Sequence, residues 1–432
     1  MATSTTQLPE PNEQQAAALA AIEDWYKNRT SSFFVLQGYA GTGKTFVIQH
    51  FSNRNKGKMA FTAPTNKAAK VLRDNFASRG ERPICRTIHS LLGLQMTADG
   101  EIRELTKPED PVDLGDLKLV IVDEAFMLGS QIFSYIKDTA EKYKVKFLFM
   151  GDPKQLPPVK EDKSPVLDLP EGAELTKVMR HDNQILTLAT HIREICDNPV
   201  PRFNLQSDND GEQGVWKLGN QDFIRKVKAA AEEGRFQRAN ESKIIAWRNV
   251  QVDSWNWVVR DTLFGADEAA INTWLPTDRV ILTGPAKDLV EDEMIASTDD
   301  EGRVDRADRL PHPMHSEVEC WRLSITTDDN RPLVLWTPTV EGARVAFRES
   351  ERLAALARTD KKRWKDYWAF KEQFHSVRHA YAITAHRSQG STYNSCFVDY
   401  MDILKNPRRS EGLRCLYVAC SRPKHSLYLG GL

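Results

Sequence analysis

The segment at residues 38–45 constrains this chain more than any other part of its 432-residue sequence. It reads GYAGTGKT and fits the pattern G-x-x-x-x-G-K-[ST], with an apolar run before it and a helical pattern after it. In that setting the glycines let backbone N–H groups surround phosphates, the lysine reaches the β and γ oxygens, and the Ser or Thr hydroxyl binds Mg²⁺. A glycine-rich turn without a ligand is the alternative, but such a turn requires neither this spacing nor the Lys-Thr pair. We therefore expect ATP and Mg²⁺ as cofactors, held by Gly38, Ala40, Gly41, Thr42, Gly43, Lys44 and Thr45.

Two acids follow a second apolar run, at residues 119–122. Asp123, at the end of a buried strand, can hold Mg²⁺ together with Thr45, and Glu124 can position and deprotonate an attacking water. Acids often cap a following helix, so the pair alone is weak evidence. Together with the phosphate segment it predicts hydrolysis of the nucleotide, with Lys44 and Glu124 as catalytic residues. Gln155 follows a third apolar run and could sense the γ-phosphate through its amide, although a surface turn is an equal alternative.

The composition excludes several classes of protein. Lys and Arg total 59 against 60 Asp and Glu, so the net charge of -1 excludes a histone-like polycation but allows a locally basic channel. No stretch approaches the ~18 apolar residues that span a bilayer, and the N-terminus lacks the apolar core of a signal peptide. The six cysteines form no C-x-x-C pair, which favours reduced thiols in a cytoplasmic protein.

The hydrophobic periodicity predicts an α/β fold with an insertion. Short apolar runs alternate with helical patterns over residues 12–160, as in a parallel sheet, and the same pattern returns twice later. A β-rich, turn-rich stretch separates the two later parts, so we expect two α/β domains with a small β domain inserted into the second. The expected boundaries are 1–174 for the first domain, 175–275 and 376–432 for the second, and 276–375 for the insertion.

A β-hairpin is expected within residues 90–116 of the first domain. Asp99-Gly100 lies between two stretches of alternating apolar residues, and Asp-Gly is a strong signal for a hairpin turn. A loop decoration is the alternative interpretation.

In this order, the segments resemble the motifs of the superfamily 1 helicases, and within them the B branch typified by RecD and the Dda-type phage helicases. The resemblance extends over nearly the whole chain and is carried by residues 12–15, 61–69, 85–90, 151–155, 175–180, 382–391 and 417–422. The chain departs from the family pattern at Arg387 and Thr392, where lysine and glutamate are common, and at Cys420-Ser421, which replaces the frequent Leu-Thr.

The resemblance implies two RecA-like parallel-sheet domains, a hairpin that acts as a duplex-splitting pin, and an SH3-like fold for the inserted domain. It implies that Gln15 reads adenine, with Gln14 as an alternative, and that Gly390 belongs to the nucleotide site. It adds Arg180 and Arg422, both expected in the second α/β domain, as catalytic contacts to the γ-phosphate. Single-strand contacts are expected from short polar side chains at strand ends, which bind phosphates without reading sequence. These residues are Pro64, Thr65, Asn66, Thr87, His89, Asn249, Thr384 and His386.

These expectations together describe an ATP- and Mg²⁺-dependent DNA helicase that acts in DNA replication, repair or recombination. The resemblance alone gives translocation from 5′ to 3′ on single strands, and a bacterial cell or a phage-infected host as the setting. Single-stranded DNA and DNA forks are the expected partners, with a single-strand-binding or replisome protein as a further candidate, no membrane partner, and a monomeric state. Two alternatives stay open: an RNA-directed helicase or remodelling ATPase without unwinding activity, and a non-enzymatic nucleic-acid-binding module that carries ATP as a structural ligand.

An aromatic and basic segment at residues 361–374 ends the insertion. Trp364, Tyr367, Trp368 and Phe374 fall near one face at helical spacing. Such a stripe beside basic residues could stack nucleotides, but stripes of this kind are more often buried faces. We expect it to pack and to anchor the insertion to the second α/β domain.

Overall fold

The computed structural model of the protein describes residues 9–28, 31–55, 57–77, 83–96, 102–104, 112–158, 161–177, 184–196, 205–290 and 293–432. The chain divides into two compact units. The first contains Met1–Pro201, Gln389–Ser391 and Arg408–Ser421, and the second contains Arg202–Ser388, Thr392–Pro407 and Arg422–Leu432. The chain therefore passes between the units several times, and each unit is described by itself below.

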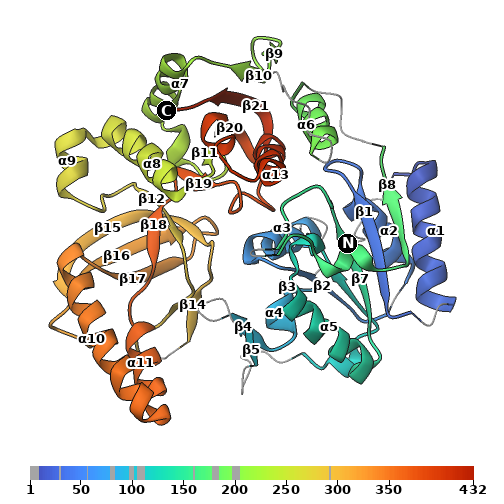
Figure 1. The fold of residues 1–432 in the computed structure, drawn as a ribbon, viewed down its shortest axis with the longest axis horizontal. Coiled ribbons are helices and arrows are strands. Elements are labelled where there is room, and N and C mark those ends of the chain that lie inside the picture. Colours follow the sequence, from blue (N-terminus) through green and yellow to red (C-terminus); the bar gives the residue numbers. More distant parts are fainter. Residues whose placement is uncertain are drawn as a thin grey trace, which may run out of the picture. The chain divides into compact units, whose positions relative to one another are not determined.

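The first unit is built on a six-stranded sheet in which every neighbouring pair of strands is parallel. Its strand order is β3 (Ile84–Thr87), β2 (Met59–Ala63), β6 (Leu119–Val122), β7 (Lys146–Gly151), β1 (Phe33–Gly38) and β8 (Gly172–Leu175). One face is covered by α1 (Glu13–Asn28), α2 (Lys44–Arg54) and α3 (Asn66–Ala77), and the other by α4 (Ile88–Leu91) and α5 (Ser130–Tyr143) (Figure 1). Because successive residues of a strand point to opposite faces, Leu119 and Ile121 join the first core and Val120 and Val122 join the second.

A short antiparallel pair follows α4 in the first unit. It consists of β4 (Leu94–Met96) and β5 (Ile102–Glu104), and Gln95 lies opposite Arg103. The Asp-Gly turn that predicts this hairpin lies outside the described residues, so the structure gives the paired strands but not the tip.

The sheet of the second unit also has six strands. Its order is β19 (Ala382–Thr384), β11 (Ser242–Ala246), β20 (Tyr393–Asp399), β21 (Pro423–Gly430), β10 (Gly214–Lys217) and β9 (Asp208–Asn209), with only the β9–β10 pair antiparallel. Two helices, α7 (Asn220–Glu232) and α8 (Asn249–Phe264), supply Phe223, Trp255 and other core residues against it. Two shorter helices are α9 (Ala266–Ile271) and α12 (Tyr400–Ile403).

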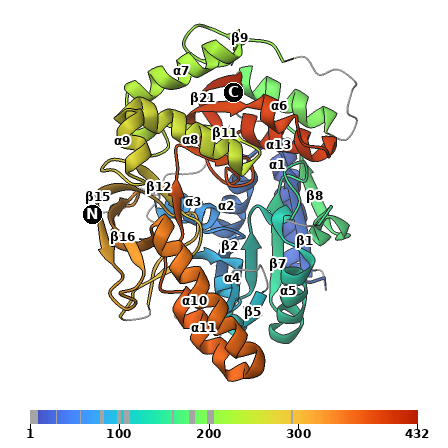
Figure 2. The ribbon, with the colours of Figure 1, turned by 60° about the vertical axis from the view of Figure 1, so that its left-hand side comes forward.

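An antiparallel five-stranded sheet forms the inserted part of the second unit. Its order is β17 (Pro332–Pro338), β16 (Glu319–Thr327), β15 (Glu301–Pro311), β12 (Arg279–Leu282) and β18 (Val377–His379). A two-stranded pair, β13 (Ala286–Lys287) and β14 (Met294–Ala296), lies beside it in the sequence. Two helices, α10 (Val340–Thr359) and α11 (Trp364–Lys371), lie side by side after β17 (Figure 2).

The structure confirms the predicted fold class: parallel α/β sheets with an inserted antiparallel β part. The exact three-domain boundaries stay a prediction. The inserted sheet runs from Arg279 to His379, and the first unit extends to Pro201 and includes Arg408–Ser421. Among the described residues, no helix is both long enough and apolar enough to cross a membrane.

The predicted aromatic stripe is wrong in its assignment of buried residues. Trp364 is 37% exposed, and Tyr367, Trp368 and Phe374 are only half-buried. The buried aromatic of this segment is Phe370, which the sequence analysis did not select. The helix ends at Lys371, so the helical projection that places Phe374 on the same face does not apply beyond that residue.

Buried charges, rather than the aromatic stripe, join the inserted sheet to the α/β sheet of the second unit. The Lys243 Nζ on β11 donates to Glu301 Oε2 of β15 at 2.8 Å. Arg279 of β12 binds the same carboxylate at 3.4 Å and Asp328 at 2.6 Å, and the Lys243 and Arg279 side chains are each 5% exposed. A buried charge without a partner is strongly destabilising, so these pairs fix one arrangement of the two sheets.

Candidate active site

The phosphate segment forms a loop between β1 and α2 of the first unit. Gly41 and Gly43 have φ angles of 83° and 87°, a backbone conformation that favours glycine over other residues. The buried Thr42 hydroxyl donates to the Tyr39 carbonyl at 2.9 Å and holds the loop in shape. The N-terminus of α2 points its free N–H groups and its positive dipole end at this loop, which suits a phosphate anion.

Lys44 is the first residue of α2, and its side chain folds back over the loop. Its Nζ donates to the Gly38 carbonyl at 2.6 Å and to the Tyr39 carbonyl at 3.0 Å. The ammonium is therefore held over the loop by weak neutral acceptors, which a charged phosphate oxygen can replace.

The two candidate glutamines of α1 have different partners. The buried Gln15 donates from Nε2 to the Thr42 carbonyl of the phosphate loop at 3.1 Å. Gln14 instead donates to the Thr176 hydroxyl at 2.9 Å and accepts from the Lys177 N–H at 2.9 Å. The structure thus brings Gln15, and not Gln14, to the phosphate loop.

The two predicted acids lie at the same sheet edge as the loop, because β1, β7 and β6 are successive parallel strands. Burial raises the pKa of the Asp123 carboxyl, while the Lys44 ammonium and a 2.8 Å hydrogen bond from the Glu124 N–H oppose that rise. A cation beside Asp123 would favour its charged form. The donors offered here, the Asp123 carboxylate and the Thr45 hydroxyl, are the hard oxygen ligands that Mg²⁺ prefers, so the residues present fit that ion.

Glu124 adopts a strained backbone conformation. Its φ and ψ of 49° and 37° lie in the left-handed region, which a residue with a side chain rarely occupies. Strain of this kind persists where the surrounding structure requires it, most often at functional sites.

Gln155 lies on the loop that follows β7, at the same edge of the sheet. The residue is 7% exposed, and its Oε1 is buried without a hydrogen-bond partner among the described residues. A buried acceptor of this kind is costly to leave unpaired, so it is suited to accept a hydrogen bond from a ligand or water.

Helix α13 (Arg409–Cys420) contributes two side chains that bind this loop, and the sequence analysis missed both contacts. Arg414 Nη1 donates to the Pro153 and Gln155 carbonyls at 2.9 and 3.0 Å, and the Tyr417 hydroxyl donates to Asp152 Oδ2. Tyr417 lies inside the segment 417–422 that carries the resemblance, so the sequence contains a signal for it. Arg414 binds backbone carbonyls, which every residue has, so the sequence contains no pattern that indicates its contact. A further missed contact is that of the Arg193 guanidinium, which lies over the ring of Tyr39.

The remaining predicted nucleotide residues are placed as follows. Gly390 has a φ of 70° and belongs to the first unit, where an added Cβ would lie 3.2 Å from the Cβ of Ala68 in α3. Arg422 belongs to the second unit, is 6% exposed, and accepts at its carbonyl from the Tyr393 N–H. Arg180 lies outside the described residues.

Predicted strand contacts of the first unit lie at the ends of β2 and β3, which are neighbours in the sheet. Pro64, Thr65 and Asn66 follow β2, and the Thr65 hydroxyl accepts from the Ala68 N–H at 3.2 Å. Thr87 caps α4 by accepting from the Ser90 N–H at 3.1 Å. Both threonines therefore act as helix caps, a common role for threonine at the start of a helix.

His89 differs from its neighbours because its ring is not engaged in a cap. Its Nε2 is buried and has no hydrogen-bond partner among the described residues. Burial also lowers the pKa of the imidazole, so the ring is neutral near pH 7.

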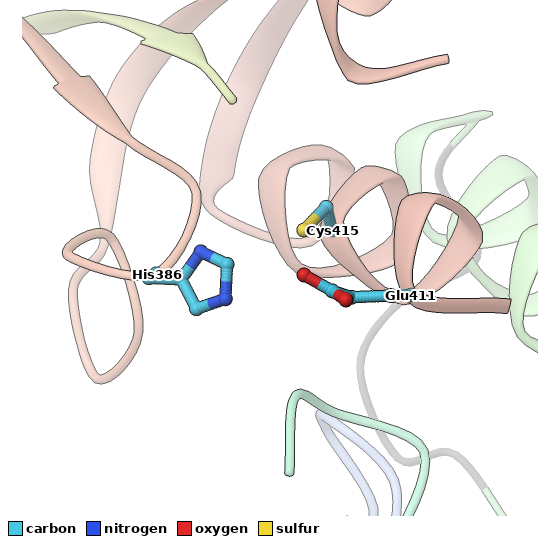
Figure 3. A group of neighbouring side chains, drawn as sticks. All are labelled: His386, Glu411 and Cys415. Carbon is cyan, nitrogen blue, oxygen red and sulfur yellow. The ribbon is translucent and has the colours of Figure 1, made fainter. Parts of the chain in front are cut away.

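The predicted strand contacts of the second unit lie near the ends of β19 and β11, which are also neighbours. The Thr384 hydroxyl accepts from the Arg387 N–H at 3.3 Å, and His386 lies on the loop after β19 (Figure 3). Asn249 is the first residue of α8, and its Oδ1 accepts from Arg378 at 3.0 Å. The Arg387 guanidinium forms an ion pair with Asp299 at 3.2 Å.

Comparison with known families agrees with this geometry. Residues 10–202 match the AAA domain family, and residues 379–429 match the UvrD-like helicase C-terminal domain. The chain therefore contains an AAA domain and a UvrD-like helicase C-terminal domain, and it is homologous to superfamily 1 helicases of the B branch, which are ATP-hydrolysing enzymes.

Three relatives describe its place among them. The chain is 23% identical to the ATP-dependent DNA helicase dda of Enterobacteria phage T4, over 91% of this chain and 93% of that protein. It is 22% identical to the uncharacterized protein R530 of Acanthamoeba polyphaga mimivirus, over 96% of this chain and 99% of that protein. Its fold is similar to that of a Pif1 helicase solved in a study of forked dsDNA, with a TM-score of 0.52, 16% identity, and coverage of 97% and 92% of the two chains.

Proposed function

We propose that the protein is an ATP- and Mg²⁺-dependent DNA helicase that translocates from 5′ to 3′ on single-stranded DNA. The observation that carries the proposal is the meeting of Lys44, Asp123 and Glu124 at one edge of a parallel sheet. A relative that covers nearly the whole chain and is named an ATP-dependent DNA helicase supports DNA as the substrate.

Each residue of the site has a defined role in the proposed hydrolysis. Thr45 and Asp123 would hold Mg²⁺, which supplies charge to the phosphate oxygens when it is bound. Lys44 binds the phosphates, Glu124 takes the proton of the attacking water, and Gln155 senses the γ-phosphate through its side-chain amide. Arg422 and Arg180 would stabilise the charge that spreads over the γ-phosphoryl oxygens.

The proposed strand contacts predict a particular binding behaviour. Apart from Pro64, the candidate residues are threonines, histidines and asparagines at or just after strand ends, which suit backbone phosphates rather than base edges. Binding should therefore show little sequence preference and should weaken as the salt concentration rises.

Further parts of the proposal rest on single observations. The β4–β5 pair supports a pin that separates the duplex. The free thiols of all six cysteines and a relative from a phage support a cytoplasmic location, in a bacterial cell or a phage-infected host. The protein would act as a monomer on single strands and forks.

The direct test is unwinding of two matched DNA forks that carry either a 5′ or a 3′ single-stranded tail, with the Lys44→Ala variant as the control without hydrolysis. We expect unwinding of the 5′-tailed fork only, and ATPase stimulation by single-stranded DNA more than by RNA of the same length. Unwinding of the 3′-tailed fork alone would reverse the polarity. Stronger stimulation by RNA, or stimulation without unwinding, would support an RNA-directed helicase or a remodelling ATPase instead.

A further inference from the structure

Helix α13 holds an unusual place in the chain. The strands before and after it, β20 and β21, are neighbours in the sheet of the second unit, yet α13 itself belongs to the first unit. There it lies beside α6 (Gln184–Ile195). Figure 3 shows Glu411 and Cys415 on successive turns of α13, and Arg414 precedes Cys415 directly.

From this position α13 binds the loop that carries Gln155. Arg414 Nη1 donates to the carbonyls of Pro153 and Gln155, and the Tyr417 hydroxyl donates to the carboxylate of Asp152. Asp152 and Tyr417 are 1% and 2% exposed, so the carboxylate–hydroxyl bond forms away from water, where such bonds are strong.

These contacts act on the orientation of the Gln155 side chain. Its Oε1 has no hydrogen-bond partner among the described residues, so the amide direction depends on the backbone to which it is attached. Arg414 binds the carbonyl of Gln155 itself at 3.0 Å, and the Asp152 carboxylate also accepts from the Lys154 N–H at 2.9 Å. The loop backbone is therefore held at Asp152, which Tyr417 binds, and at the Gln155 carbonyl, which Arg414 binds.

We propose that Arg414 and Tyr417 are positioning residues that hold Gln155 in its working orientation during ATP hydrolysis. The helix that carries them ends at Cys420, two residues before Arg422. Because α13 binds the loop at Asp152, Pro153 and Gln155, a movement of this helix would also move the loop. This inference rests on the role proposed above for Gln155.

A double-mutant cycle tests whether Arg414 acts through Gln155. We would measure nucleotide affinity, melting temperature and single-strand-stimulated ATP turnover for Arg414→Met, Gln155→Ala and the double variant, with Arg409→Met as the control that removes the same charge from the same helix. We expect each single variant to lower kcat about tenfold or more, because a misplaced catalytic group is costly even when binding is intact. ADP affinity and melting temperature should stay near those of the wild type.

The decisive value is the turnover of the double variant. If Arg414 acts through Gln155, the double variant should turn over at the rate of Gln155→Ala, since the second change removes nothing further. The proposal would be overturned if the fold-loss of kcat in the double variant equalled the product of the two single losses. Wild-type turnover in Arg414→Met would also overturn it, as would a fall of kcat that is matched by a fall in melting temperature. Arg414→Lys, which keeps a charged donor, should recover part of the turnover.

A second variant, Tyr417→Phe, removes only the hydroxyl. We expect it to lower kcat without changing ADP affinity and to show the same lack of additivity with Gln155→Ala. If Gln155→Ala alone turned over at the wild-type rate, the proposed role of Gln155 would fail and this inference with it. If Gln155→Ala were slow but the loss in the double variant equalled the product of the two single losses, the role of Gln155 would stand. Only the positioning role of Arg414 would then be overturned.

Discussion

The backbone conformation at position 124 favours glycine, whereas the proposed chemistry requires the carboxylate of Glu124. The left-handed conformation costs a residue with a Cβ about 1–2 kcal/mol, and glycine avoids that cost. We therefore expect Glu124→Gly to be more stable than Glu124→Ala by about 1 kcal/mol, which reverses the usual order of these two residues. Thermal unfolding of both variants would measure the difference, and an equal or higher melting temperature for Glu124→Ala would contradict it.

The chemistry of the same residue gives a separate prediction. Glu124→Gln keeps the shape of the side chain but cannot accept the proton of the attacking water. It should bind ATP with Mg²⁺ as the wild type does, because Asp123 remains, and should hydrolyse ATP at least a hundredfold more slowly, on the order expected for loss of a general base. Equilibrium nucleotide binding and steady-state turnover would be compared. Loss of nucleotide binding would show that Glu124 is a metal ligand instead.

At the residue scale, the sequence indicates the groups whose type and spacing carry the chemistry. Lys44, Asp123 and Glu124 were predicted from their positions after apolar runs, and the structure brings them to one sheet edge. The choice between Gln14 and Gln15 needed the structure, because adjacent helix residues point in directions about 100° apart. Arg414 was not predicted because its acceptors are backbone carbonyls, which every residue has.

At the scale of the element, α11 shows why a helical stripe can mislead. The helix has eight residues, and its buried aromatic is Phe370 rather than Trp364. We expect Phe370→Ala to lower the free energy of unfolding by about 3–5 kcal/mol, and Trp364→Ala by less than about 1 kcal/mol. Chemical denaturation would measure both values. A larger loss for Trp364→Ala would mean that its ring is covered in solution.

The β4–β5 pair allows a test that separates ATP hydrolysis from unwinding of the duplex. Replacing residues 97–101 and the strand ends beside them by a tight turn would shorten the hairpin without changing the phosphate loop. Single-strand-stimulated ATPase should persist, because Lys44 and Glu124 are untouched, while unwinding of a forked duplex should fall severalfold or more. A matched substitution in an exposed surface turn would be the control, and equal unwinding by the shortened protein would show that the hairpin is a decoration.

Element types were easier to predict than element roles. Period-two and continuous apolar runs correctly indicated the strands at 33–37, 119–122 and 146–150. The link between the inserted sheet and the α/β sheet was assigned to aromatics, whereas the structure shows Lys243, Glu301 and Arg279. Residues 243, 279 and 301 are far apart in sequence, so no local pattern could have indicated their ion pairs.

For the whole molecule, buried histidines predict a loss of stability in acid. Burial lowers the pKa of His312 and of His379 from 6.5 to about 4, and both belong to the second unit. Between those two pKa values the unfolded chain binds a proton that the folded chain excludes, so stability falls as the pH falls from 6.5 towards 4. The slope should approach about 1.4 kcal/mol per pH unit for each histidine.

Calorimetry between pH 7 and pH 5 would detect this as a falling melting temperature for the second unit. The His312→Gln variant should show a shallower dependence on pH, whereas a substitution of the exposed His425 should leave the slope unchanged. A melting temperature that does not change over this range would contradict the prediction.

The repeated passage of the chain between its two units limits how such a protein can be divided. A fragment that ended at Pro201 would contain the phosphate loop but would lack α13. The Asp152 carboxylate would then lose the Tyr417 hydroxyl, and two loop carbonyls would lose Arg414, so the loop that carries Gln155 would no longer be held in place. The ATPase part is therefore not a separable module, and neither half of the gene could be exchanged for that of a relative unless α13 and its loop were exchanged together.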